Sequence, residues 1–192
     1  FLAILGILVG TASVVAMVSC GELATAAALA QFKALGTNLL SMSVYQQSSE
    51  ETKSKQKAFA IEDAMSIKKV SKQINIVAPY ATVYMPVAFK GKRLSVSSII
   101  GATDELMPAI KIKVKEGRFL SFLDHYAYYC VIGNRLYKQL LSTSGDPMGK
   151  QMHLGKNIFT VIGVLDPWVE NQFFNENVNN AVFIPLTTSL IL

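Results

Sequence analysis

The chain has 192 residues, which is enough for one domain or two small ones, and 51% of them are hydrophobic. Its 18 basic and 13 acidic residues give a net charge of +5, but Glu22 is the only charged residue before Lys33. This uneven distribution excludes one ordinary soluble domain over the whole length, and it divides the chain into an apolar front and a mixed remainder.

The apolar front predicts a membrane-spanning helix. Residues 1–21 carry no charge, and as a helix they would reach about 30 Å, the thickness of the hydrocarbon layer. A buried helix of a soluble protein would be shorter or would show a polar stripe. Three other interpretations of this segment fit the sequence less well. A secretory leader would begin with Met and basic residues, and a lipoprotein would have a polar linker after Cys20. A pilin would have glutamate at the position of Leu5.

An alanine-rich run continues the helix beyond the membrane segment. Residues 23–32 are all compatible with helix, and Gly36 is a natural C-terminal stop. We therefore expect one helix of about nine turns, whose outer part, from Gly21 to Leu35, is a rigid stalk. Gly36 is either only the helix stop, the plainer interpretation, or a pivot between the stalk and the domain after it.

The remaining elements alternate between short strands and short helices, an α+β pattern with mostly antiparallel hairpins. Helices are predicted over 61–70, 135–141 with Asn134 as N-cap, and from 186 with a cap near Thr187 or Thr188. Residues 104–109 are expected to form a short helix or a turn, broken at Pro108. Strands are predicted over 37–45, 74–89, 94–100, 111–115, 128–132, 152–154, 158–165 and 181–184, with turns at 90–92 and 155–157. Residues 46–57 and 166–179 are expected to be loops.

Two glycines in the membrane segment are candidates for helix packing. Gly6 and Gly10 are one turn apart, and Ser13 and Met17 continue the same stripe. Small residues at this spacing let a second helix approach closely, although glycine is also simply common in membrane helices. We therefore hypothesise a helix–helix contact at Gly6, Gly10 and Ser13.

No constellation of residues indicates catalysis, a cofactor site or a metal site. Ser121, Asp124 and His125 lie within five residues, whereas the members of a catalytic triad come from separated segments, so polar residues at a helix start are the better interpretation. The Gly-Lys pairs lack the phosphate-binding loop pattern, and Cys20 and Cys130 have no ligand spacing. The scattered lysines favour a solvated face, or attraction to acidic partners or lipid headgroups, over nucleic acid.

Several short motifs, in order and at matching spacing, resemble the first membrane helix and periplasmic core of MacB/FtsX-like ABC-transporter permeases. They are Leu5–Gly10, Leu35–Asn38, Gly101, Glu116–Ser121 with Asp124, Val131–Gly133, Met148–Lys150, Phe159–Leu165 and Phe183–Thr188. The resemblance covers nearly the whole chain, but residues 53–57 and 168–179 match no motif and are plausible surfaces for a partner or substrate.

The resemblance implies an α+β fold with a transmembrane and stalk helix over 1–36 and a two-lobed domain outside the membrane. Residues 37–115 and 180–192 would form a porter-like lobe, and residues 116–179 a smaller inserted lobe. It also implies a second permease copy, a cytoplasmic ABC ATPase that holds the ATP, and in some relatives a periplasmic adaptor and an outer-membrane duct.

The implied function is to couple cytoplasmic ATP hydrolysis mechanically to export or release of a substrate outside the inner membrane. The stalk would transmit the motion, and the large domain would be periplasmic or extracellular. The alternative is a membrane-anchored or lipoprotein binding domain with no role in transport.

Overall fold

The structure is a computed structural model that describes residues 1–35, 39–42, 61–71, 73–96, 98–170, 174 and 176–192. The chain divides into two compact units, Phe1–Leu39 and Leu40–Leu192. Gly36, the Lys-rich loop 53–57 and most of the strand predicted over 37–45 lie outside the described residues. The part of that strand that is described, residues 39–42, has no regular secondary structure.

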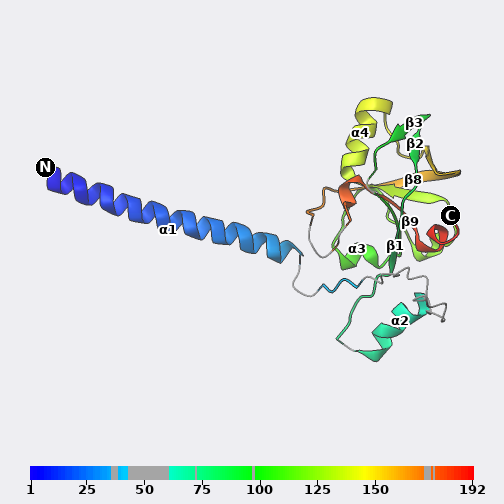
Figure 1. Ribbon diagram of the computed structural model, residues 1–192, viewed down its shortest axis with the longest axis horizontal. Coiled ribbons are helices and arrows are strands. Elements are labelled where there is room, and N and C mark those ends of the chain that lie inside the picture. Colours follow the sequence, from blue (N-terminus) through cyan, green and yellow to red (C-terminus); the bar gives the residue numbers. More distant parts are fainter. Residues whose placement is uncertain (36–38, 43–60, 72, 97, 171–173, 175) are drawn as a thin grey trace, which may run out of the picture. The chain divides into compact units, whose positions relative to one another are not determined.

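The first unit consists of one helix, α1 (Leu2–Leu35), drawn in blue in Figure 1. Its 34 residues run without a break from the apolar segment through the alanine-rich run, so the prediction of a continuous helix of about nine turns is confirmed. Leu2–Ala26 is long and apolar enough to cross a membrane, by length and composition.

The second unit is built on one mixed sheet. Its strands are β1 (Tyr80–Val83), β2 (Val87–Phe89), β3 (Lys92–Leu94), β4 (Ile99–Ala102), β5 (Val114–Gly117), β6 (Tyr129–Ile132), β7 (Gln151–Leu154), β8 (Asn157–Leu165) and β9 (Val182–Pro185). They lie in the order β1-β4-β9-β6-β8-β7-β2-β3, and β5 pairs with β8. The helices are α2 (Ile61–Val70), α3 (Leu106–Ala109), α4 (Asn134–Ser144) and α5 (Leu186–Ser189), with 3₁₀ turns η1 (Phe122–Asp124) and η2 (Val178–Asn180).

A single long hairpin, residues 80–102, supplies both ends of this sheet. β1 pairs with β4 at one end and β2 with β3 at the other, yet only residues 84–86 join β1 to β2. Those residues span at most about 14 Å. Six strand spacings would separate β1 from β2 by about 29 Å in a flat sheet. The sheet must therefore curve strongly, and its end strands are β1 and β3, which are labelled in Figure 1.

The curved sheet encloses the hydrophobic core together with one helix. Fully buried side chains come from β2, β4, β6, β7, β8 and β9, and α4 packs on them. The members are Val87, Phe89, Ile99, Cys130, Ile132, Leu136, Tyr137, Leu140, Met152, Leu154, Phe159, Val161, Val164, Val182 and Ile184. β8 has nine residues. In its first part buried and more exposed residues alternate, because every second side chain points into this cluster, and its last three residues are all buried.

Both predicted hairpin turns are confirmed. Lys90 and Gly91 join β2 to β3 with φ of 48° and 77°, the left-handed pair that a two-residue hairpin turn requires. Gly155 and Lys156 join β7 to β8. The helix predicted over 61–70 is α2, and the α+β class is confirmed.

The pairing is mostly antiparallel, as predicted, and two strand pairs, β4–β9 and β6–β8, are parallel. Other details differ from the sequence predictions. Gly133, not Asn134, is the N-cap of α4, because the Asn134 side chain instead donates to the Leu165 carbonyl at 3.3 Å. Pro185 precedes α5 in place of a threonine cap. The strand predicted over 111–115 begins only at Val114, because Lys111, with φ of 54°, is in a turn after α3.

The predicted lobe boundaries do not coincide with a break in backbone hydrogen bonding. β2 belongs to the predicted porter-like lobe and pairs with β7 of the predicted insertion. β9, from the porter-like lobe, lies between β4 and β6. Among the described residues, both parts therefore share one sheet, and the two-lobe division stays a prediction.

Replacing Gly163 by alanine should destabilise the sheet. A Cβ atom there would overlap the Arg118 carbonyl, where β5 crosses close to β8. Because this neighbour is backbone, we expect a loss of about 2–4 kcal/mol in the free energy of unfolding. The control is Gly91→Ala, which costs only about 1 kcal/mol for its left-handed backbone because its surroundings are open. Equal melting temperatures for the two variants would contradict the prediction.

Candidate functional site

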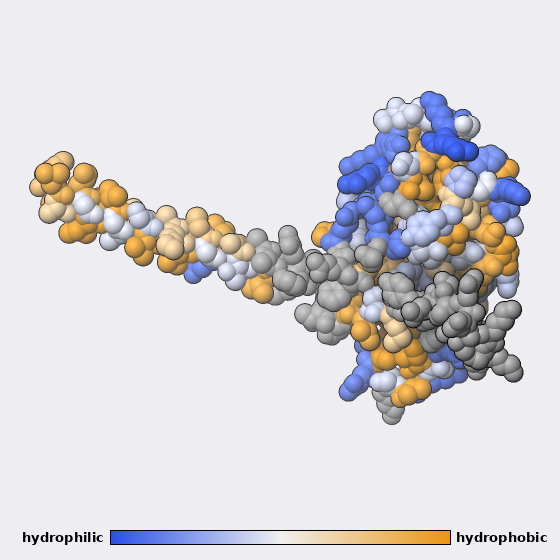
Figure 2. All heavy atoms as spheres, in the orientation of Figure 1, coloured by the Kyte–Doolittle hydropathy of each residue, from blue (hydrophilic) through white to orange (hydrophobic). Residues whose placement is uncertain are grey.

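Three hydroxyl groups of the apolar segment of α1 are hydrogen-bonded to the helix backbone. The Thr11 and Ser13 hydroxyls donate to the carbonyls of Leu8 at 3.1 Å and Val9 at 2.8 Å. Thr25 does the same to Gly21 at 2.8 Å. A hydroxyl without a partner is costly in hydrocarbon, so these bonds suit α1 to a lipid environment. Over the residues of α1 that are coloured in Figure 2, the visible face is largely apolar.

The predicted packing stripe is an open surface of α1. An added Cβ at Gly6 or Gly10 would meet no heavy atom within 4 Å, and Gly10 belongs to a shallow depression lined also by Ile7, Thr11, Val14 and Val15. The helix periodicity puts Gly6, Gly10 and Ser13 on one side. The structure thus brings these three predicted residues together, while Gly36 lies outside the described residues.

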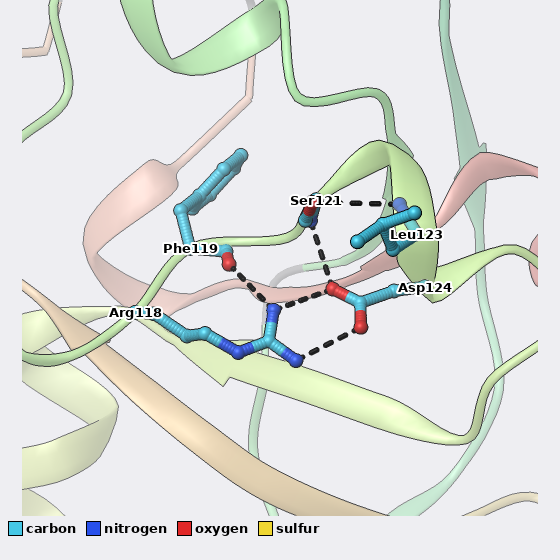
Figure 3. Close-up of polar contacts among 5 residues, drawn as sticks. All are labelled: Arg118, Phe119, Ser121, Leu123 and Asp124. Atoms are coloured by element: carbon cyan, nitrogen blue, oxygen red, sulfur yellow. Dashed lines mark hydrogen bonds and ion pairs between the residues drawn. The ribbon is translucent and has the colours of Figure 1, made fainter.

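In the sheet domain, one salt bridge organises the motif Glu116–Asp124. The Arg118 guanidinium donates from Nη1 to Asp124 Oδ2 at 2.5 Å and from Nη2 to Oδ1 at 2.8 Å (Figure 3). Nη1 also donates to the Phe119 carbonyl at 3.2 Å. Asp124 Oδ2 accepts the Ser121 amide at 2.8 Å, and Ser121 Oγ accepts the Leu123 amide, so Ser121 and Asp124 form a capping box on η1.

The two partners of this salt bridge differ in burial, and each changes the pKa of the other. The Asp124 side chain is 7% exposed, whereas that of Arg118 is 50% exposed. The hydrogen bonds from Arg118, aided by the Ser121 amide, lower the pKa of Asp124, although burial opposes the shift. The same bond raises the pKa of Arg118. The pair stays ionised, and we call it the Arg118–Asp124 clamp.

The clamp fixes an exposed apolar tip. Phe122, Leu123 and Tyr126 are 68%, 87% and 62% exposed. Tyr126 has φ of 58°, and its amide donates to Thr187 Oγ1 at 3.2 Å. Thr188 Oγ1 donates to the Ala127 carbonyl at 3.1 Å. Two threonines of α5 therefore hydrogen-bond to the backbone at the base of the tip. The tip is therefore an apolar projection held by polar contacts at its base.

The sequence predicted Ser121 and Asp124 as residues at a helix start, but it did not predict the pairing of Asp124 with Arg118. The Ser121-x-x-Asp124 spacing is that of a capping box and could have indicated one. The pairing with Arg118 depends on the tight crossing at Gly117, whose φ is 76°, and the sequence gives no signal for that.

The arrangement does not suit catalysis. The Asp124 carboxylate faces Arg118, and the His125 ring packs edge-on against Phe122 at 4.7 Å, so the interpretation of Ser121 and Asp124 as helix-start residues is confirmed. Across the described part of the chain, no three His, Cys, Asp or Glu side chains are placed to hold a metal ion. Burial raises the pKa of the Cys130 thiol, which makes it a poor nucleophile.

The segment after β8, which matched no motif, is anchored to the sheet domain. The Asn179 side chain accepts the Trp168 amide at 2.9 Å and donates to the Trp168 carbonyl at 2.7 Å. Trp168 Nε1 donates to the Ile110 carbonyl at 2.9 Å. Further along, the Glu176 carboxylate accepts the hydroxyls of Thr82 at 2.9 Å and Ser98 at 2.6 Å. The described residues of this segment therefore hold it against the rest of the sheet domain by hydrogen bonds.

A hollow of about 340 Å³ lies beside the two links that join the hairpin strands at one end of the sheet to those at the other end. Its lining is Val83, Tyr84, Met85, Val96, Ser98 and Ile99. Apart from the Tyr84 phenol and the Ser98 hydroxyl, which is engaged with Glu176, these side chains are apolar. Its described lining residues do not combine an acid, a base and a nucleophile.

Comparison with known sequences gives one family over nearly the whole chain. The family described as MacB-like periplasmic core domain matches residues 1–191. The macrolide export ATP-binding/permease protein MacB of Rhodopseudomonas palustris strain HaA2 is 28% identical over 192 residues, which cover 98% of this chain and 29% of that protein. MacB of Azoarcus sp. strain BH72 is 30% identical over 97% of this chain and 28% of that protein. The chain therefore spans less than a third of these relatives.

Solved structures share the fold. The periplasmic region of MacB from Actinobacillus actinomycetemcomitans superposes with a TM-score of 0.53 at 22% identity, covering 68% of this chain and 56% of that one. The extracellular domain of the noncanonic ABC-type transporter YknZ from Gram-positive bacteria gives 0.54 at 21% identity, covering 67% and 63%.

Removing the Asp124 charge should destabilise the domain in a pH-dependent way. Asp124→Asn leaves Arg118 unpaired, so we expect a loss of about 1–3 kcal/mol at about pH 7. The folded-state pKa of Asp124 is lowered, so its stabilisation is complete above the unfolded value of about 4 and is lost as pH falls below it. Thermal unfolding at several pH values should show wild type and variant converging at low pH.

The matched control is Asp104→Asn, because Asp104 is an exposed carboxylate of the same domain. It should change the melting temperature little at any pH. A difference between wild type and Asp124→Asn that stays constant down to about pH 3 would contradict a role for the ionised clamp.

Proposed function

Because this chain belongs to the family of MacB-like periplasmic core domains, we propose that it is the first membrane helix and extracytoplasmic domain of an ABC-transporter permease. The observation that carries the proposal is the match over residues 1–191, which includes both the membrane segment of α1 and the sheet domain. A binding domain that was merely anchored to a membrane would have no reason to match the family through its anchor as well.

The proposed place of the protein is the inner membrane of a bacterium, with the sheet domain on the outer side. Leu2–Ala26 would cross the lipid, and the nearly uncharged composition of that segment supports this. ATP would bind to a separate or fused ABC ATPase domain on the cytoplasmic side. Substrate, adaptor and duct are not encoded in any recognisable motif of the chain.

The proposed mechanism is mechanical coupling through α1. A helix transmits displacement along its axis because every residue is held by backbone hydrogen bonds. The helix continues without interruption from the apolar segment to Leu35, about 50 Å in total. ATP binding on the cytoplasmic side would move the membrane helices, and the stalk from Gly21 to Leu35 would carry that motion to the sheet domain.

The permease is proposed to work as a dimer, with α1 contributing to the contact in the membrane. Lipid removes the hydrophobic drive for association, so close packing at small residues replaces it. Gly6 and Gly10 provide such a surface, and Ser13, whose hydroxyl is satisfied by Val9, adds no exposed polar group.

Interrupting the stalk should uncouple ATP hydrolysis from transport. Four glycines inserted after Leu29 add about one turn of low helix propensity, whereas four alanines at the same place add the same length of stable helix. In the full permease with its ATPase, we expect the glycine variant to lose transport by at least about tenfold at unchanged ATP hydrolysis. Equal transport by the glycine and alanine variants would refute the proposed role of the stalk.

Filling the glycine stripe should weaken assembly. The double substitution Gly6→Leu and Gly10→Leu should lower association of the permease in lipid nanodiscs by roughly tenfold, measured by energy transfer between labelled copies. Ala12→Leu is the matched control, because it adds the same side chain on another side of the helix. Normal assembly of the double variant would exclude this contact.

A further inference from the structure

The apolar tip of residues 122–126 is a surface that the fold itself does not use. Phe122, Leu123 and Tyr126 lie within five residues of one another and are all exposed, Leu123 to 87%. None of them belongs to the buried cluster of the sheet domain. Apolar side chains that gather on the surface of a domain mark a site of interaction with a protein or a membrane. The tip therefore has the composition of an interaction surface.

The tip is held in place before it meets any partner. The Arg118–Asp124 clamp and the capping box on η1 close its turn, and Thr187 and Thr188 of α5 hydrogen-bond to its base. Side chains that are already positioned lose little conformational entropy on binding. Because the tip is a projection, it fits either a pocket of matching shape or a fluid surface.

The charges around the tip favour an anionic surface. From residue 118 to residue 129 the only carboxylate is Asp124, which is paired with Arg118. The Arg118 side chain is half-exposed, and its guanidinium carbon lies 5.6 Å from the centre of the Tyr129 ring. All 18 basic residues and all but one of the 13 acidic residues lie from Lys33 onward, so this part of the chain is basic overall. A basic domain is attracted to anionic lipid headgroups.

The aromatic residues of the tip match the layers of a bilayer surface. Tyr126, Tyr128 and Tyr129 are exposed beside Phe122 and Leu123. Tyrosine is enriched at the level of lipid headgroups, where its ring meets an apolar layer and its hydroxyl reaches water. Phenylalanine and leucine are residues with which interfacial segments enter the acyl chains. A protein would need a pocket of matching shape, whereas fluid lipid accommodates a projection of any shape.

Lipid is also the partner that the chain itself brings close. Leu2–Ala26 is long and apolar enough to cross a membrane, and α1 continues only to Leu35, about 13 Å further. In the proposed function, the sheet domain is therefore tethered to the bilayer. A tethered group meets its target at a high effective concentration, so weak insertion of a few side chains is enough to be populated.

We propose that the tip inserts into the lipid surface beside the sheet domain. Phe122 and Leu123 enter the upper part of the acyl-chain layer, and the three tyrosines lie among the headgroups. This inference rests on the membrane location in the proposed function and not on transport. Insertion fixes which face of the sheet domain is turned to the membrane, because the clamp and α5 hold the tip to the sheet.

Fluorescence quenching by lipids in the full-length permease tests this contact. In a background with Cys20→Ala, Leu123→Cys carries the fluorophore NBD, and the fully buried Cys130 stays unlabelled. The permease is placed in nanodiscs of phosphatidylethanolamine and phosphatidylglycerol, with or without a phosphatidylcholine that carries a doxyl quencher on its acyl chain. We expect the quencher to lower the fluorescence at position 123 at least about twofold, with emission at a shorter wavelength than in water.

Two control positions give the result its meaning. Ser142→Cys, on an exposed residue of α4, should show no quenching. Val15→Cys, in the apolar segment of α1 and on the side away from Gly6 and Gly10, should be quenched as a residue in lipid. Quenching at position 15 but not at position 123 would overturn the inference and leave the proposed membrane location intact. Quenching at neither position would contradict both, so the two failures are distinguishable.

Emission at a short wavelength from position 123 without quenching would mean that protein covers the tip. A second copy or a protein partner would then be the occupant, and the inference would be overturned.

A photoactivatable lipid keeps the test independent of the labelled variants. The unmodified permease is irradiated in nanodiscs that contain a phosphatidylcholine with a diazirine on its acyl chain, and its tryptic peptides are analysed by mass spectrometry. We expect lipid adducts on the peptide of residues 119–135 and none on the peptide of residues 139–150, which contains Ser142. A tip peptide without adducts would also overturn the inference.

Discussion

The sheet domain depends on the short links within one hairpin. Residues 84–86 and 95–98 are too short to cross a flat sheet of this width, so the two ends of the sheet must approach each other. That curvature creates an interior in which β2, β4, β6, β7, β8, β9 and α4 share one buried cluster. The hollow beside Met85 and Val96 lies at these links, where the hairpin strands separate.

A second tight approach, between β5 and β8, positions the clamp. Gly117 and Gly163 allow the two backbones to meet without Cβ atoms, and the Arg118 amide donates to the Ile162 carbonyl at 3.1 Å. From there the Arg118 side chain reaches Asp124 and closes the turn that carries Phe122 and Leu123. A motif that serves as a family signature in the sequence is thus a structural device, and its residues are engaged with one another.

The sequence allowed prediction of the features that are local in origin. The absence of charge up to Gly21 predicted α1, and Lys90-Gly91 and Gly155-Lys156 predicted two turns. Features that depend on distant partners were not predictable: the parallel pairing of Ile99 with Val182, and the side chain of Asn134 bonding to Leu165. The clamp joins residues only six apart, but its geometry depends on the close approach of Gly117 to β8. The stripe of Gly6 and Gly10 was visible from spacing alone, and its contact with a second helix stays a prediction.

The central place of β9 has a consequence for how the domain folds. β9 lies between β4 and β6, although it comes about 80 residues after β4 in the chain. Until residues 182–185 have been synthesised, β4 and β6 have no strand between them and the buried cluster is incomplete. Folding is therefore a late event dominated by long-range pairing, which is slow compared with local helix formation. During that interval the nascent chain exposes apolar strands, which makes it prone to aggregation.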